Sequence, residues 1–374
     1  MGAMNELINQ AAVTSLTEVL ADAAPGTEWQ HVILAGATLH GLSLRERTDH
    51  VSRALLADLA AGRNNGSPTA DCRTAVAVFR SALGSQQFAG WTLWPVSETA
   101  VTLALGSGTP ADFDDCLQLL AELTPRLTGE FAIRRLLAAD PDRALAIIIE
   151  WTQHPDEHVR RLASEGTRPY LPWAVRVPGL TRNPGGTTPI LDALYRDPSD
   201  YVRRSVANHL NDLARHAPEA VMTTAAAWVA APDANTAWVL RHGLRTLVKK
   251  AHPGALALQG FAPASVSVTP LRLDRDEVVM PAELGFGLEI SNTGGQDARL
   301  AVDYVVHYLK ANGSLSEKVF KLAAFTLAPG EARPLSKRHA FRQMTTRVHH
   351  AGLHALELQV NGVRHARTEF LVRI

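Results

Sequence analysis

Residues 159–165 read VRRLASE, residues 202–208 read VRRSVAN, and residues 239–245 read VLRHGLR. The first valines of the three stretches lie 43 and 37 residues apart, and each stretch follows a turn opened by a proline: Pro155, Pro198 or Pro232. Similar helical segments that recur about every 40 residues after such a turn are typical of HEAT-like helical pairs. The spacing therefore predicts a solenoid of stacked helices.

The helical pattern extends on both sides of these stretches. Apolar residues recur three and four positions apart from Asn5 to Lys250, with prolines and glycines between the segments. After Gly254 the pattern changes to short alternating runs separated by turns such as Asn312-Gly313. We expect about seven strands, among them residues 266–268, 284–290, 300–309, 323–327 and 353–360. The sequence thus predicts a multidomain chain: an all-α HEAT-like solenoid over residues 1–260 and an all-β immunoglobulin-like sandwich over residues 261–374.

The composition is that of an ordinary globular protein. Of the 374 residues, 46% are hydrophobic and 20% are charged. No run of about 18 apolar residues predicts a membrane span, and the first residues lack the pattern of a secretion signal. Cys72 and Cys116 both lie in apolar helical patterns, so we expect two buried free thiols and a cytoplasmic protein.

The formal net charge is zero, but the charges are unevenly distributed along the chain. Residues 1–120 carry a net charge of −6, and the remaining residues carry +6. A basic body is compatible with phosphate binding, although a surplus of this size is weak evidence by itself.

Helical geometry predicts a column of polar side chains opposite the apolar stripe of each repeat helix. The three columns are Arg161–Glu165–Arg168, Arg204–Asn208–Asp212 and Arg241–Arg245–Lys249. Stacking would place them side by side as a basic surface with Glu165 and Asp212 embedded in it. Two interpretations stay open at this point: ordinary ion pairs on solvated helices, or a nucleic-acid-binding surface. A tryptophan between prolines, Trp173, favours the second but also suits a plug between repeats.

Two long segments carry a resemblance to a known family. Residues 161–173 read RLASEGTRPYLPW and residues 201–212 read YVRRSVANHLND. They resemble the AlkC branch of the HEAT-like alkylpurine DNA glycosylases, which also have an appended immunoglobulin-like domain. The resemblance implies an enzyme of base excision repair that releases cationic methylated bases, chiefly N3-methyladenine and N3-methylcytosine. It also implies the catalytic positions on this sequence, which are Glu130, Glu165, Trp173 and Asp212.

The chemistry of that reaction fits these residue types. Carboxylates stabilise the cationic sugar left by bond cleavage, one of them orients the attacking water, and an aromatic face suits a cationic base. We expect no cofactor or metal, a monomer, and alkylated double-stranded DNA as the partner. The residues expected to bind DNA phosphates are basic: Arg161, Arg168, Arg204, Arg241, Arg245, Lys337 and Arg338. Glutamate at a helix start, as at Glu130, is also explained by the helix dipole.

Other chemistries find little support in the sequence. It contains no Walker-type phosphate loop, no Gly-x-Ser-x-Gly elbow and no His-Glu-x-x-His pair. No lysine stands among the expected site residues, which predicts hydrolysis by water without a Schiff base. The principal alternative is a non-catalytic HEAT scaffold that binds DNA or a protein, because solenoids commonly serve as binding surfaces.

Overall fold

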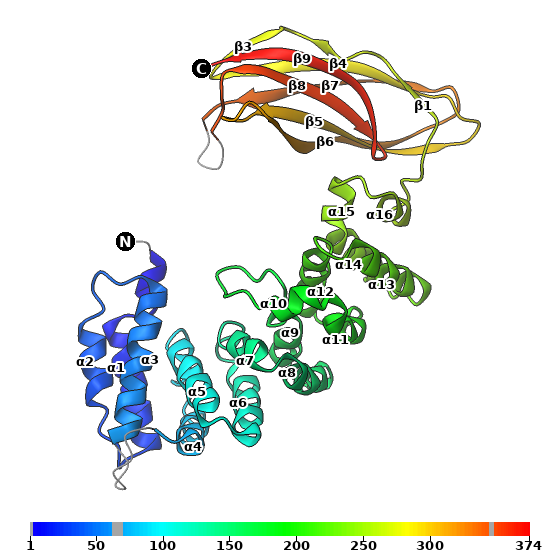
Figure 1. Ribbon diagram of the computed structural model, residues 1–374. Coiled ribbons are helices and arrows are strands. Elements are labelled where there is room, and N and C mark those ends of the chain that lie inside the picture. The colour runs from blue at the N-terminus through cyan, green and yellow to red at the C-terminus, as the bar shows by residue number, and fades with distance from the viewer. Residues whose placement is uncertain (1–2, 62–69, 344–347) are drawn as a thin grey trace. The chain divides into compact units, whose positions relative to one another are not determined.

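The computed structural model describes residues 3–61, 70–343 and 348–374 (Figure 1). The chain divides into two compact units, Met1–Gly243 and Leu244–Ile374. The described part of the first unit is helical, whereas the second has two short helices followed by strands. None of the helices in the described ranges is long and apolar enough to cross a membrane.

The helices of the first unit follow one another in chain order and pack against helices close to them in the chain, as the predicted solenoid requires (Figure 1). The first six are α1 (Gln10–Ala23), α2 (Gln30–Ala37), α3 (Leu44–Ala61), α4 (Cys72–Ala82), α5 (Leu93–Ser107) and α6 (Pro110–Leu123). The next are α7 (Ile133–Ala139), α8 (Pro141–Ile148), α9 (Glu157–Glu165), α10 (Pro178–Arg182), α11 (Thr188–Leu194), α12 (Asp200–Leu213), α13 (Pro218–Ala230) and α14 (Thr236–Gly243). Short 3₁₀ turns lie at Ala3–Leu7, Ile149–Gln153 and Pro184–Thr187. Cys72 and Cys116 are free and buried, as predicted.

The proline-containing turns start helices for a clear local reason. Pro110 and Pro141 occupy the first helical position, where the missing N–H is not needed. The residue before each proline caps the helix: Thr109 Oγ1 accepts from the Asp112 amide at 3.2 Å, and Asp140 Oδ1 from the Arg143 amide at 3.0 Å.

The first two repeated segments lie on α9 and α12, the third begins on α14, and α12 packs against both of the other helices. Two of the predicted columns are interrupted, however. Helix α9 ends at Glu165, so Arg168 lies in the following turn rather than on the helix face. Helix α14 ends at Gly243, where an added Cβ would lie 2.8 Å from the Leu210 side chain. Arg241 and Arg245 therefore belong to different helices.

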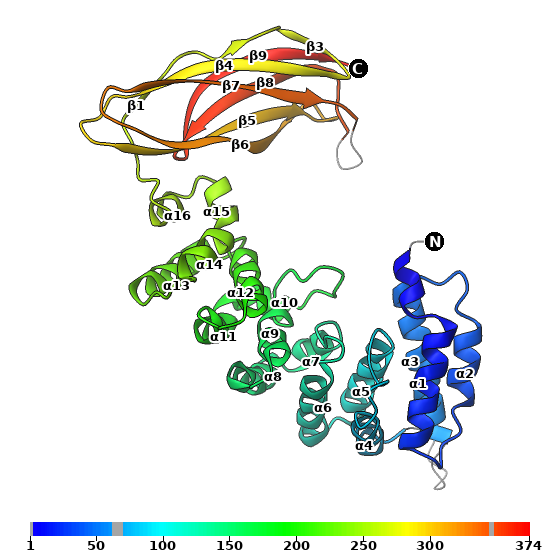
Figure 2. The same cartoon turned by 180° about the vertical axis from the view of Figure 1, so that it is seen from behind.

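The second unit is a sandwich of two sheets (Figure 2). One sheet has the order β1-β4-β2, with β7 also paired to β4, and the other has the order β3-β9-β8-β5-β6. The strands are β1 (Val266–Val268), β2 (Arg272–Leu273), β3 (Glu277–Val279), β4 (Ala282–Asn292), β5 (Ala298–Leu309), β6 (Leu315–Leu327), β7 (Ala332–Phe341), β8 (Gly352–Val360) and β9 (Val363–Arg373). Inward residues of both sheets form its core, among them Phe286, Tyr304, Phe341 and Phe370.

All five strand segments named from the sequence are present, within β1, β4, β5, β6 and β8. Strand β7 escaped prediction because it is polar along most of its length and, among the described strands, pairs with β4 alone. The predicted immunoglobulin-like sandwich is confirmed.

Two short helices, α15 (Arg245–Lys249) and α16 (Pro253–Leu258), pack with the strands of the second unit. Gly362, at the β8–β9 turn, leaves room for Leu256 and Ala251, since an added Cβ would lie 2.8 and 2.9 Å from them. Asn361 Nδ2 donates to the carbonyls of Ala262 and Arg299 at 2.7 and 3.0 Å. The division into compact units therefore falls after Gly243. The change from helix to strand lies near residue 260, and a domain boundary there stays a prediction.

Candidate active site

Five side chains of alternating charge form one connected row in the first unit, which we call the acidic row. Arg161 Nη1 binds Glu130, and Arg161 Nη2 lies 3.5 Å from Glu165 Oε1. Arg168 Nη1 donates to the same Glu165 oxygen at 2.6 Å, and Arg168 Nε donates to Asp212 Oδ2 at 2.9 Å. Three carboxylates thus share two guanidinium groups within the row. The structure brings together all three acids that the resemblance implied.

Successive repeats supply the members of the acidic row. Glu130 lies in the turn between α6 and α7, where Thr128 Oγ1 donates to its Oε2 at 2.9 Å. Glu165 is the last residue of α9, and Asp212 lies in the last turn of α12. The two side chains are buried, with 6% and 2% of their residue surfaces exposed. An ion pair on a solvated helix does not describe this arrangement.

A buried polar contact sets the register between α9 and α12. Ser164 and Ser205 are joined through their hydroxyls at 3.0 Å. His209 Nδ1 donates to the Ser164 carbonyl at 2.9 Å, and its Nε2 lies 3.1 Å from Thr187 Oγ1, from which it accepts. Burial lowers the pKa of His209 to about 3, so the ring is neutral and both hydrogen bonds are satisfied. Because Ser164 precedes Glu165 and His209 precedes Asp212 by one turn, this contact aligns the two acids.

The electrostatics of the acidic row differ from one end to the other. Burial raises the pKa of Asp212 despite the nearby charge of Arg168. For Arg168, burial opposes the charged form, but Glu165 and Asp212 outweigh it and raise the pKa of the guanidinium. Arg168 therefore stays charged, and Asp212 is a better proton acceptor than an ordinary aspartate.

Trp173 occupies an exposed and strained position in the segment that follows the acidic row. It has 80% of its surface exposed and a backbone φ of 61°, which a bulky residue rarely adopts. A plug between repeats would be buried, so that alternative does not describe this side chain. Such outliers gather at functional sites, where surrounding contacts hold them.

The arginines predicted to bind phosphates fall into two groups. Arg161 and Arg168 lie between the carboxylates and are largely buried. Arg204 is mostly exposed and pairs with Asp200 at 2.8 Å. Arg241 is exposed on α14, and Arg245 begins α15 of the second unit. Contact with DNA stays a prediction for all five.

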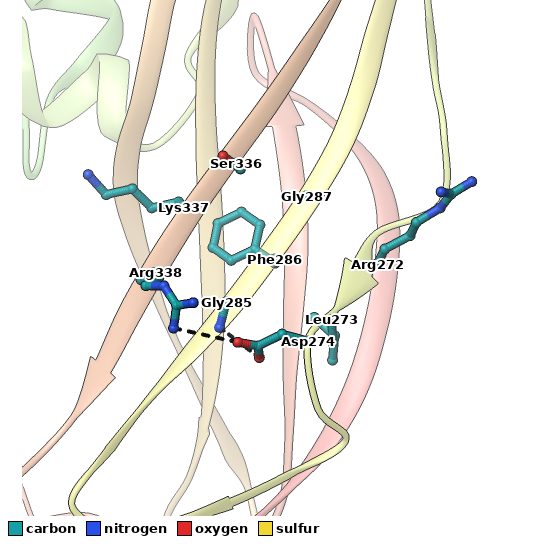
Figure 3. A pocket seen from close by; sticks show the side chains of 9 residues that line it. All are labelled: Arg272, Leu273, Asp274, Gly285, Phe286, Gly287, Ser336, Lys337 and Arg338. Carbon is teal, nitrogen blue, oxygen red and sulfur yellow. Dashed lines mark hydrogen bonds and ion pairs between the residues drawn. The ribbon is translucent and has the colours of Figure 1, made fainter.

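Lys337 and Arg338 lie on β7, beside a shallow hollow of about 490 Å³ in the sheet that contains β4 (Figure 3). Figure 3 shows Arg338 directed toward Asp274, whose Oδ2 is 3.7 Å from Arg338 Nη1, and Lys337 extending away from it. Gly285 and Gly287 line the hollow without side chains of their own. Of the neighbouring basic residues, Arg333 lies over the ring of Phe325, and Arg347 is outside the described residues.

Sequence reasoning missed Arg134, which contacts the turn of Arg168 and is fully buried. The available signal was an arginine in the apolar stripe of a helix, in the run Ile133-Arg134-Arg135-Leu136-Leu137. Arginine at such a position needs several buried hydrogen-bond acceptors. Among the described side chains, no three His, Cys, Asp or Glu gather in a way that would hold a metal ion.

Comparison with known proteins places this architecture. A family model described as "Uncharacterised protein YhaZ, C-terminal Ig-like domain" matches residues 267–374. The uncharacterized protein YhaZ of Bacillus subtilis (strain 168) is 36% identical over 253 residues, which cover 67% of this chain and 70% of that protein. A solved structure shows the Pseudomonas fluorescens alkylpurine DNA glycosylase AlkC bound to DNA containing an abasic site analog. Its sequence is 33% identical to this chain, and the two structures superpose over 100% of both chains with a TM-score of 0.79.

A helical solenoid followed by an immunoglobulin-like domain is the architecture that this chain shares with an alkylpurine DNA glycosylase. This chain belongs to the AlkC family of alkylpurine DNA glycosylases.

Proposed function

We propose that this chain hydrolyses the N-glycosidic bond of cationic methylated bases in double-stranded DNA, chiefly N3-methyladenine and N3-methylcytosine, for base excision repair. The observation that carries the proposal is the buried acidic row, which brings three carboxylates from successive repeats together. Family membership supports a DNA glycosylase, and the abasic DNA analog bound to AlkC supports DNA as the substrate.

The carboxylates of the row suit the positive charge that develops on the sugar in the reaction. Methylation makes the base cationic, so it departs without protonation by an enzyme acid. Cleavage then leaves oxocarbenium character on the sugar, which nearby carboxylates stabilise more strongly in a site that excludes water. The two arginines bind the three carboxylates through ion pairs and hydrogen bonds, which holds the acids in place.

Asp212 is the better candidate for orienting the attacking water. Only its Oδ2 accepts the Arg168 hydrogen bond, and burial raises its pKa, which improves it as a proton acceptor. In the proposal Glu165, whose Oε1 contacts both arginines, stabilises the sugar cation. The face of Trp173 offers a π surface to a cationic base or to the sugar.

DNA contacts are assigned to the basic residues outside the acidic row. In the proposal, Arg204 and Arg241 bind phosphates from the first unit, and Arg245, Lys337 and Arg338 bind them from the second. Arg161 and Arg168 bind the carboxylates of the row, and we assign them to phosphates only after that role. We propose that the protein works as a monomer in the cytoplasm.

Incubation of the purified protein with methylated duplex DNA, followed by chromatography of the supernatant, tests the proposal. The expected result is release of free N3-methyladenine and N3-methylcytosine well above the spontaneous rate measured in DNA alone. Tight DNA binding with no base released would instead support the non-catalytic scaffold.

A further inference from the structure

The segment between α9 and α10 carries Trp173 into solvent, yet its two ends are held firmly. Trp173 has the left-handed φ of 61°, and Pro172 and Val175 beside it are also exposed. A conformation of this kind costs about 1–3 kcal/mol and persists only when neighbouring contacts determine it. Those contacts therefore show what orients the tryptophan.

A single buried guanidinium binds both ends of this segment. Arg134, from α7, donates from Nη1 to the carbonyls of Gly166 at 3.0 Å and Arg168 at 2.6 Å. Its Nε donates to the carbonyl of Val175 at 3.0 Å. The side chain is fully buried, and although burial lowers its pKa to about 10, it remains charged at neutral pH. Hydrogen bonds to a charged donor are stronger than those between neutral groups.

A second set of contacts holds the middle of the segment from the other side. The guanidinium groups of Arg176 and Arg215 lie over the ring of Tyr170, at 4.3 and 4.5 Å from its centroid. It also stacks on His216 with the centroids 5.3 Å apart. These contacts are nearer the surface than Arg134 and can be altered without opening the core.

The Arg134 guanidinium is also connected to the acidic row, through the backbone of Arg168. The Arg168 carbonyl accepts from Arg134, while the Arg168 side chain bridges Glu165 and Asp212. Movement of that backbone would shift the aromatic ring and the carboxylates together.

We infer that Arg134 is a positioning residue. By binding both ends of the segment between α9 and α10, it fixes the ring of Trp173 and the Arg168 bridge in one geometry. The inference deepens the proposed function and rests on it. Arg134 has no direct part in the chemistry, so its loss should reduce the rate of base release and leave DNA affinity almost unchanged.

The test compares Arg134→Gln with Arg135→Gln, a matched control on the same helix whose guanidinium instead donates to Thr102 at 2.8 Å. A misplacement of about 1 Å can reduce a rate about 100-fold, so we expect R134Q to lower the maximal single-turnover rate by about that factor. The DNA concentration for half-maximal rate should change little, and R135Q should retain the wild-type rate. Arg134→Lys, which offers one donor centre, should fall between wild type and R134Q.

A double-mutant cycle separates positioning from general damage. If Arg134 acts through Trp173, R134Q should have a much smaller effect in a W173A background than in the wild type. Tyr170→Ala, which loosens the segment without touching the core, should show the same pattern and carries the test if R134Q melts far below the wild type. Rate losses that multiply in both cycles would show that Arg134 does not act through Trp173 and would overturn that part of the inference.

The fluorescence anisotropy of Trp173 provides a readout independent of catalysis, isolated by subtracting the signal of a W173F variant. Faster depolarisation in R134Q and Y170A than in R135Q is expected, and equal decays would contradict the inference. Should wild-type protein release no base, the proposed function fails, while the anisotropy still decides whether Arg134 positions the ring.

Discussion

The buried histidine that aligns α9 with α12 makes a quantitative prediction about stability and pH. His209 is neutral in the folded protein, with a pKa of about 3, whereas an imidazole in the unfolded chain has a pKa of about 6.5. Between these two values the unfolded chain binds one more proton at this position than the folded protein does. Acidification through that window therefore favours unfolding, by about 1.4 kcal/mol per pH unit.

At pH 4.5 the contribution of His209 should accordingly be about 2.7 kcal/mol less favourable than at pH 7. Substitution by glutamine removes the titrating group and alters the hydrogen bonds to Ser164 and Thr187. We expect H209Q to be less stable than wild type at pH 7 by about 1–3 kcal/mol. The difference between the two proteins should shrink or reverse at pH 4.5.

Urea unfolding of wild type and H209Q at several pH values between 4 and 8 measures this difference directly. Because all other titrating groups are common to both proteins, the subtraction isolates His209. His158→Gln, at a half-buried position early in α9, is the control for a change of histidine to glutamine in this region. Parallel stability curves for wild type and H209Q would refute the account of a buried neutral ring.

Three further predictions concern the reaction and the DNA. Base release should leave an abasic site without strand cleavage, survive EDTA and form no borohydride-trapped adduct; a trapped protein–DNA adduct would contradict hydrolysis by water. The rate should fall on acidification at a pH above the usual pKa of an aspartate, because burial raises the pKa of Asp212. A rate that falls only near the usual aspartate pKa would argue against this role. Replacing Lys337 and Arg338 by glutamine should weaken DNA binding and flatten its log–log salt dependence by about one to two units of slope. The matched control replaces Arg364 and Arg373 by glutamine, and both of these arginines form ion pairs with glutamates of the same domain. This variant should bind DNA like wild type.

Local patterns predicted much of the fold. The Pro-Asp turns and three similar helices indicated a solenoid, and alternation with Asn-Gly turns indicated the sandwich; both depend on interactions between residues close in sequence. The acids of the site came from the resemblance in residues 161–173 and 201–212, because no spacing rule distinguishes them from surface ion pairs.

The remaining features depend on partners far apart in the chain. Arg168 was expected in an open basic column, but its helix ends three residues earlier and it bridges to Asp212, 44 residues away. Arg134 reaches Val175 across 41 residues. Such contacts follow from how neighbouring repeats pack, which a single sequence does not specify.

The acidic row is the centre of the account, and Asp212→Asn tests it most directly. Asparagine keeps the shape and can still accept the Arg168 hydrogen bond, so the substitution removes mainly the negative charge. Single-turnover release of N3-methyladenine from duplex DNA should be measured alongside the affinity for the same DNA. The matched control is Asp142→Asn, at an exposed position on α8. We predict a rate about 100- to 1,000-fold below wild type for D212N, with DNA affinity unchanged or slightly tighter and D142N fully active. A D212N protein that releases the base at the wild-type rate would contradict the assignment of this row as the active site.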